Sequence, residues 1–286
     1  MKIENSLHRL EKDFTSGSYE LGLMAIEILL DYLELSNKDW RKNLPLLCRR
    51  LVGTKPDMAT LLNISHLTLL ESERKNSSKE NVKRTLFKMK SDLKDSVKKI
   101  GEVGQSLLSE KSVLMTHSRS KTVFTVIQEG VKRGVIERMY VTQSYPLGEG
   151  IIFSREIKKL GIETLLIPDS SMGPYLPRCD FVLLGGDALT EKYLVNKVGS
   201  LPLALLSRYT QKPLYCALDT FKFIPSNLYS LREGKNSLFE PVPLSLISNV
   251  ITEEGVINRG DVKKNLQSII EKKWKKRRAI GLLKQD

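Results

Sequence analysis

The sequence predicts an α/β protein in which an N-terminal helical domain precedes a doubly wound parallel sheet. Apolar residues recur at spacings of three and four through residues 1–108, which is typical of helices packed on a core. From Lys111 onwards, short apolar runs alternate with segments of helical length, which is the pattern of repeated strand–helix units. A chain of 286 residues has room for both parts, each with a core of its own.

The helical part is predicted from three segments. Between Ser18 and Leu35, the apolar positions at helical spacing are Leu21, Met24, Ile28 and Leu29. Pro56 is expected to open the next helix, because proline is favoured in a first helical turn. The apolar positions of that helix are Met58, Leu61, Leu62 and Leu69.

A long amphipathic helix is expected to follow Ser77 and Glu80, which have the spacing of a capping box. Its apolar stripe consists of Val82, Leu86, Met89, Leu93, Val97, Ile100 and Val103. We interpret this stripe as core, and contact with a second copy remains the alternative.

The sheet is predicted from five mostly apolar runs without polar alternation, as expected for strands buried on both faces. They are Val113–Thr116, Arg138–Thr142, Thr164–Ile167, Phe181–Leu184 and Leu214–Leu218. The crossover helices are expected at Arg119–Lys132, Arg155–Leu160 and Val198–Tyr209. We therefore predict a helical domain at residues 1–108, a ligand-binding sheet domain at 109–270 and a basic tail at 271–286.

The formal net charge of +13 favours anionic partners such as sugar phosphates, nucleotides, RNA or an acidic protein surface. Part of the excess lies near the C-terminus, in Lys263, Lys264, Lys272, Lys273, Lys275, Lys276, Arg277 and Arg278. We interpret this segment as a solvated helix face and tail. Binding of RNA or a protein through it is the alternative, although Trp274 alone is a poor base-stacking platform.

Other classes of protein are disfavoured. No apolar run approaches the ~20 residues that cross a bilayer, and the first residues lack the apolar core of a signal peptide. The three cysteines have no CxxC spacing, so no disulfide framework or zinc site is expected. His66 and His117 make a poor ligand set, and neither a metal nor a cofactor is expected. The expected location is the cytoplasm.

Ligands of open parallel sheets bind beyond the carboxyl ends of the strands, so the residues there are candidates for a site. Ser118-Arg119-Ser120-Lys121-Thr122 opens a helix directly after the first strand, where backbone N–H groups, hydroxyls and cations favour an anion. Ordinary N-capping by serine is the alternative for this segment. The GxxxxGK spacing of a Walker A loop is absent.

A second candidate segment is Gly185-Gly186-Asp187, where two glycines allow a ligand close to a carboxylate. Nine residues further on, Asn196 and Lys197 supply an amide and an ammonium at the expected start of the next helix. The acid and the lysine are either an acid–base pair or an ion pair that locks a loop. Lys222 follows the fifth strand.

Seven stretches carry a family resemblance. They are KPDMATLLN (55–63), VLMTHSRSKTV (113–123), YVTQSYPLGEG (140–150), LIPDSSMG (166–173), FVLLGGDALTEKYLVNKVGS (181–200), KPLYCALDTFKF (212–223) and NSLFEPVPLSLISNVITEEGV (236–256). On these, the chain resembles the superfamily of the α, β and δ regulatory subunits of translation initiation factor 2B, ribose-1,5-bisphosphate isomerase and methylthioribose-1-phosphate isomerase. The resemblance implies a Rossmann-like C-terminal domain, dimers or higher oligomers, and a ligand pocket between the domains.

The resemblance also assigns roles. The isomerases of this superfamily use an aspartate, which Asp187 matches, and a cysteine after the first strand, whose position Ser118 occupies. Asn196 and Lys197 match positions that contact the substrate. The remaining residues expected to bind the ligand are Ser120, Lys121, Gly186 and Lys222.

Three differences from the isomerase sequences favour ligand binding over isomerisation. A serine hydroxyl is a much weaker acid than a thiol. Ser16-Gly17-Ser18 stands where the isomerases have Arg-Gly-Ala, and Thr142-Gln143-Ser144-Tyr145-Pro146 stands for Thr-Glu-Thr-Arg-Pro. We therefore expect an initiation factor 2B-like regulatory protein that binds a sugar phosphate or nucleotide without the cysteine-dependent isomerase activity.

Two alternatives remain from the sequence. One is an aldose–ketose isomerase of a phosphorylated pentose that uses Asp187, with Ser118 or an ordered water in place of the thiol. The other is an RNA- or ribosome-associated factor that uses the basic tail.

Overall fold

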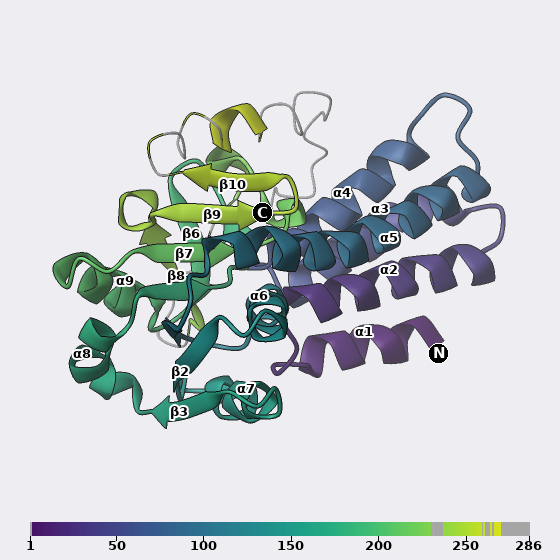
Figure 1. Cartoon of the computed structure of the whole chain (residues 1–286). Helices are drawn as coiled ribbons and strands as arrows, with labels where there is room; N and C mark the ends of the chain where they lie inside the picture. Colours follow the sequence, from purple (N-terminus) through teal and green to yellow (C-terminus); the bar gives the residue numbers. More distant parts are fainter. Residues whose placement is uncertain are drawn as a thin grey trace.

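Five helices make up the N-terminal part of the chain in the computed structural model, which describes residues 2–229, 231, 237–258, 260, 264 and 266–269. They are α1 (Lys2–Lys12), α2 (Ser18–Leu35), α3 (Trp40–Thr54), α4 (Ala59–Ser72) and α5 (Lys79–Gly104), followed by a 3₁₀ turn at Gln105–Leu107. The helices α1 to α4 pack side by side, and the longer α5 runs from them to the sheet (Figure 1). Their apolar faces share one core, in which Leu21, Leu29 and Leu44 are fully buried.

The apolar stripes expected on α2 and α5 are confirmed as core, although Met24 and Val103 are only partly buried. Two helix starts differ from the prediction. Helix α4 begins at Ala59, three residues after Pro56. Helix α5 is capped by Ser78, whose hydroxyl accepts a hydrogen bond from the Asn81 N–H, because the Ser77 hydroxyl is directed back to Glu71.

A seven-stranded sheet forms the second part of the chain, in the order β10-β9-β7-β4-β1-β2-β3. The strands are β1 (Ser112–Thr116), β2 (Ile136–Thr142), β3 (Glu163–Ile167), β4 (Phe181–Leu184), β7 (Leu214–Ala217), β9 (Asn249–Thr252) and β10 (Gly255–Asn258). All pairs are parallel except β9 with β10, so the five predicted strands are confirmed and two more follow them. The chain reverses its direction across the sheet between β1 and β4, which is where open α/β sheets bind ligands.

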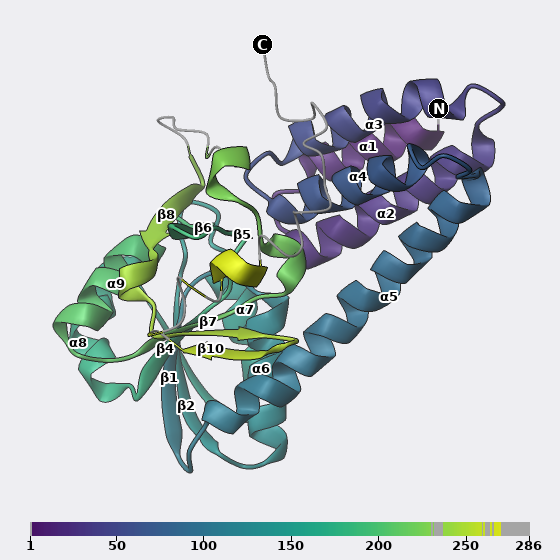
Figure 2. The same ribbon diagram turned by 90° about the horizontal axis from the view of Figure 1, so that it is seen from above.

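Helices cover both faces of this sheet, as in a doubly wound fold (Figure 2). The helices α6 (Lys121–Lys132) and α7 (Glu149–Lys158) lie on one side with the end of α5, and α8 (Met172–Tyr175) and α9 (Ser200–Tyr209) lie on the other. Successive strand residues alternate between the two cores, so that Leu114 joins one and Met115 the other. The predicted α/β fold class is confirmed.

A small antiparallel sheet lies beside the large one, in the order β5 (Ala188–Leu189), β6 (Tyr193–Lys197) and β8 (Phe239–Pro243). Asn196 and Lys197 therefore lie at the end of a strand and not, as the sequence suggested, at a helix start. The next helix, α9, begins at Ser200, after Gly199 in a left-handed conformation.

The helical part docks on the sheet through the segment 55–63. The N–H of Ala59 donates to the backbone carbonyl of Asp187 at 3.0 Å, and the Asn63 amide donates to the carbonyl of Phe221 at 2.6 Å. The Tyr229 hydroxyl donates to the carbonyl of Asp57 at 2.8 Å. The start of α4 is therefore fixed directly to the strand ends where the candidate site lies. The division of the chain into domains at residue 108 stays a prediction.

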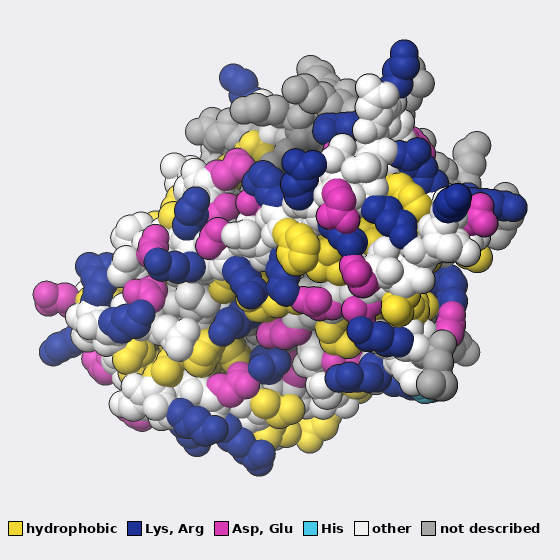
Figure 3. All heavy atoms as spheres, turned by 90° about the vertical axis from the view of Figure 1, so that its right-hand side faces the viewer, with side chains coloured by type: hydrophobic (Ala, Val, Ile, Leu, Met, Phe, Trp, Pro, Cys, Tyr) yellow, Lys and Arg dark blue, Asp and Glu magenta, His cyan; other side chains and the backbone are white. Residues whose placement is uncertain are grey.

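Charged side chains of both signs are interspersed over the face of the helical part (Figure 3). Several pairs join α5 to α2, among them Lys83 with Glu34 and Lys90 with Glu27. The basic tail at 271–286 lies outside the described residues. No helix in the described part of the chain is both long and apolar enough to cross a membrane.

Candidate functional site

A cavity of about 540 Å³ lies between the N-terminal helices and the ends of the strands. The helical part contributes residues 13–20 and 54–58 to its wall. All eight predicted site residues line it, namely Ser118, Ser120, Lys121, Gly186, Asp187, Asn196, Lys197 and Lys222. The structure thus brings together residues that are up to 104 positions apart in the sequence, from Ser118 to Lys222.

The turn between β1 and α6 places one helix N-terminus at the cavity. The Ser120 hydroxyl caps α6 by accepting from the Val123 N–H at 3.4 Å, so the expected N-cap is present. Lys121 lies over the Phe124 ring, 5.4 Å from its centroid, and no carboxylate of the described residues pairs with it within 4.0 Å. Arg119 is instead held by two hydrogen bonds of 3.0 Å to Glu156 of α7. Of the two cations in this turn, Arg119 is paired with Glu156, and Lys121 is therefore the cation available to bind a ligand.

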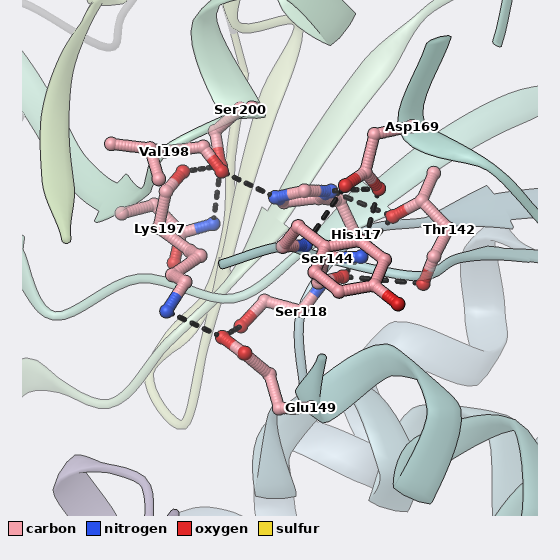
Figure 4. A network of polar contacts seen from close by, with 12 residues as sticks. His117, Ser118, Thr142, Ser144, Glu149, Asp169, Lys197, Val198 and Ser200 are labelled. Atoms are coloured by element: carbon pink, nitrogen blue, oxygen red, sulfur yellow. Dashed lines mark hydrogen bonds and ion pairs between the residues drawn. The ribbon is translucent and has the colours of Figure 1, made fainter. Parts of the chain in front are cut away.

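Ser118 is joined to Lys197 through Glu149 (Figure 4). The Ser118 hydroxyl donates to Oε1 of Glu149 at 3.0 Å, and the Lys197 ammonium lies 3.1 Å from the same oxygen. Only 4% of the Lys197 side chain and 11% of the Glu149 side chain are exposed. Sequence reasoning missed Glu149, although it lies within the stretch YVTQSYPLGEG at the first position of α7.

His117 holds the turns after β1 and β6 together. Its Nε2 lies 2.8 Å from the carbonyl oxygen of Val198, which can only accept, so Nε2 carries the hydrogen. Nδ1 then accepts from the Thr142 hydroxyl at 2.6 Å. Burial lowers the pKa of His117, against the opposing effect of the Val198 carbonyl and of Asp169 4.0 Å away. The neutral ring of His117 lines the cavity and links the two turns through its hydrogen bonds, and we assign it no metal.

Asp187 follows β4 with its side chain partly buried in the cavity wall. Burial raises its pKa to about 6, against the lowering effects of Lys222, the Ser18 hydrogen bond and Lys197. A carboxyl group with a pKa near 6 both accepts and donates protons near neutral pH. Lys222 itself pairs with the buried carboxylate of Asp219 at 3.5 Å.

The glycines before Asp187 are required by close packing. A Cβ on Gly185 would lie 2.4 Å from the Ser120 hydroxyl, and one on Gly186 would lie 2.5 Å from Leu194. Only glycine lets the β4 and β1 ends approach this closely. Asn196 stabilises the adjacent turn, because its amide donates a hydrogen bond to the Ser200 hydroxyl at 2.9 Å.

Comparison with known proteins decides the family. The model of the "Initiation factor 2 subunit family" matches residues 15–233. This chain belongs to that family. Within the described residues, no group of three or more metal-ligating side chains is gathered.

Relatives of two kinds share most of the chain. A "Putative translation initiation factor eIF-2B subunit 2-like" protein of Pyrococcus furiosus is 29% identical over 274 residues, which cover 90% of this chain and 96% of the relative. The "Ribose 1,5-bisphosphate isomerase" of Archaeoglobus fulgidus is 25% identical over 265 residues, or 84% of this chain and 85% of that enzyme.

Solved structures give the same picture. The "translation initiation factor eIF-2B" of Pyrococcus horikoshii OT3 superposes with a TM-score of 0.83 at 25% identity, covering 90% of this chain and 97% of that one. The "5-methylthioribose 1-phosphate isomerase" of the same organism has a TM-score of 0.72 at 18% identity, covering 94% and 87%, and shows the fold alone. The family thus includes both initiation factor 2B-like proteins and sugar-phosphate isomerases.

Proposed function

We propose that this protein is an initiation factor 2B-like regulatory member of its family, which binds a sugar phosphate or nucleotide in the cavity and lacks the cysteine-dependent isomerase activity. The observation that carries the proposal is the convergence of two helix N-termini and one cation on the cavity. Helix α2 begins after Gly17, which provides no side-chain cap, and a Cβ on Gly17 would lie 3.3 Å from Oε2 of Glu20 in the first turn and 3.9 Å from the carbonyl oxygen of Arg119. The starts of α2 and α6 are therefore adjacent, with Lys121 beside them.

This arrangement suits a phosphate group. Unpaired backbone N–H groups and the positive end of the helix dipole favour an anion, and a lysine adds a full charge. Asp187, Asn196 and Lys197, which also line the cavity, offer acceptors and donors for sugar hydroxyls. The family comparison supports the same ligand class, because one relative is named for its action on ribose 1,5-bisphosphate.

The absence of a thiol argues against the isomerase mechanism. The three cysteines, Cys48, Cys179 and Cys216, are buried, and none lines the cavity. Ser118 lies at the cysteine position, but its hydroxyl is a poor acid and donates to Glu149. A catalytic role for Ser118 stays a prediction.

A thermal-shift experiment tests the proposal. Ribose 5-phosphate and AMP are titrated against the wild-type protein, and at least one should raise its melting temperature. Lys121→Gln should remove that shift, because it deletes the cation at the helix N-termini. Lys132→Gln is the matched control, because Lys132 is in the last turn of the same helix and pairs with Glu129. Equal shifts in both variants, or no shift in the wild type, would refute the assignment.

The alternative is an aldose–ketose isomerase of a phosphorylated pentose, and it is favoured by the Asp187 pKa of about 6. In that reaction Asp187 moves a proton between C1 and C2, with Ser118 or a water in place of the thiol. Conversion of ribose 1,5-bisphosphate by the wild type, lost in Asp187→Asn, would establish the enzyme. No conversion between pH 5 and 9 would eliminate it.

We also propose that the protein forms homodimers or higher oligomers. The support comes from a family relative solved as the "tetrameric eIF2B-beta2-delta2 complex from C. thermophilum". Light scattering after size exclusion gives the mass directly, and a monomer at every concentration would disprove the proposal.

A further inference from the structure

We infer that Glu149 sets the ligand class of the cavity, so that the site takes a hydroxyl-bearing phosphate monoester in preference to a sugar bisphosphate. The inference rests on the proposed function and goes further, because it names the residue that discriminates between two kinds of phosphorylated ligand. Three observations carry it.

The first observation is that Glu149 already pairs with Lys197, one of the two almost fully buried lysines of the wall. Lys197 is almost fully buried, and its ammonium lies 3.1 Å from the Glu149 carboxylate. A buried cation without a partner binds an anion strongly, whereas a buried ion pair has little net attraction for a second anion. A phosphate at this end of the cavity would lie against the Glu149 carboxylate and be repelled by it.

The second observation concerns the other carboxylate oxygen. Oε2 of Glu149 is buried, and no donor among the described residues reaches it. A buried carboxylate oxygen without a hydrogen bond is unfavourable, so a ligand that supplies an O–H or N–H donor gains by binding there. Sugar hydroxyls are donors, and a phosphate dianion has none. The Glu149 end therefore favours the sugar part of a ligand.

The third observation is the charge of the wall. The described residues that line the cavity include five cations, Lys55, Arg119, Lys121, Lys197 and Lys222. They also include five carboxylates, Asp13, Glu20, Asp57, Glu149 and Asp187. Three of the cations have carboxylate partners within 4.0 Å, in Glu156, Glu149 and Asp219.

The two other cations have no carboxylate partner within 4.0 Å among the described residues. Lys121 is at the start of α6, and the Lys55 ammonium donates to the Glu11 carbonyl and lies 3.9 Å from the centroid of the Phe14 ring. Burial lowers the pKa of Lys55. The described wall thus matches one phosphate at the helix N-termini, and the pairing of Lys197 with Glu149 leaves Lys197 without free charge for a second.

Calorimetric titration with two probes tests the inference. Wild-type protein should bind ribose 5-phosphate at least as tightly as ribose 1,5-bisphosphate. Glu149→Gln keeps the shape and an acceptor for Ser118 but releases Lys197. It should tighten bisphosphate binding about ten- to a hundredfold relative to ribose 5-phosphate, the range for a hydrogen bond to a charged group.

Two further variants identify the cause. Glu20→Gln removes another wall carboxylate, one that pairs with none of the described cations within 4.0 Å. It should change the ratio of the two affinities by less than about threefold, because Glu20 lies in the first turn of α2, where both probes place a phosphate and are affected alike. The double variant Glu149→Gln with Lys197→Gln should return the ratio to the wild-type value.

The outcomes separate this inference from the function on which it rests. Failure of both probes to bind would overturn the proposed function. Binding with a wild-type preference for the bisphosphate, or with a ratio unchanged by Glu149→Gln, would overturn the role of Glu149 alone. The wild-type ratio decides the matter even if the Glu149→Gln protein does not fold.

Discussion

Two turns that each lead from a strand into a helix are linked by His117. They differ in the group that caps the N-terminus of the helix that follows. In the turn between β1 and α6, the neutral hydroxyl of Ser120 caps the helix. In the turn between β6 and α9, the carboxylate of Glu240 accepts from the N–H groups of Gly199 and Leu201 at 2.7 and 2.8 Å. The start of α9 is thus already satisfied by an anion of the protein, while the start of α6 faces the cavity without one. A helix N-terminus is therefore a candidate anion site only where its N–H groups are not already bound by an anion of the protein.

Gly199→Ala should have the largest effect, because it damages the point where the two turns meet. Gly199 has a φ of +103°, and an added Cβ would lie 2.5 Å from Cε1 of His117, whose ring is held by hydrogen bonds at both nitrogens. We expect a loss of about 3 kcal/mol in the free energy of unfolding, measured by urea denaturation. Gly134→Ala is the control, with a φ of +66° and no atom within 4 Å of the new Cβ, and should lose about 1 kcal/mol.

Glu240→Ala should make the α9 turn resemble the α6 turn. Removal of the carboxylate leaves two N–H groups without their acceptor, and we expect a loss of about 2 kcal/mol in the free energy of unfolding. Added sulfate should restore part of this loss, and Glu240→Gln, which keeps an acceptor oxygen, should lose less. An unaltered stability would show that the two turns do not differ in the way described.

The stability of the protein should depend on the protonation of Asp187, which lines the cavity. Its pKa is about 6 in the folded protein, against 3.8 for an ordinary aspartate, so the folded state binds the proton more tightly. The wild type should therefore gain about 1–2 kcal/mol relative to Asp187→Asn as the pH falls from 7 to 4.5, and lose it again as the pH rises through 6. Urea denaturation of both proteins across this range measures the difference, and parallel pH profiles would contradict it.

Ser120→Ala should have the smallest effect, because the cap that it removes is a single hydrogen bond of 3.4 Å. We expect a loss of about 1 kcal/mol in the free energy of unfolding. If the loss exceeds that of Glu240→Ala, the neutral cap is the stronger one and the comparison is reversed.

Much of the fold was predictable because its signals are local. In the runs at 113–116 and 181–184, the side chains on both faces of the strand are mostly apolar, as expected for strands that are buried on both faces of a sheet. Once the strands are placed, the parallel topology brings the residues after them to one edge, which is why the eight predicted site residues line one cavity.

The remaining features depend on contacts that are distant in sequence. Strand β6 pairs with β8, which begins more than 40 residues later and contains Pro241 and Pro243. Prolines argue against a strand except at a sheet edge, and β8 is such an edge. Glu149 meets Ser118 across 31 residues through the position of α7, which no local pattern reports. At Ser77 and Ser78 two caps competed locally, and the contact of Ser77 with Glu71 decided between them.

The backbone of Asp187 is shared between both parts of the molecule, since its N–H donates to Val195 of β6 and its carbonyl accepts from Ala59 of α4. A chimera that exchanged the helical part alone with that of a relative would combine a foreign α4 start with the native strand end. The segments 55–63 and 181–199 should therefore be transplanted together. These two segments form the contact between the helical part and the sheet part, and they also carry residues of the candidate site. They should therefore be exchanged as one unit.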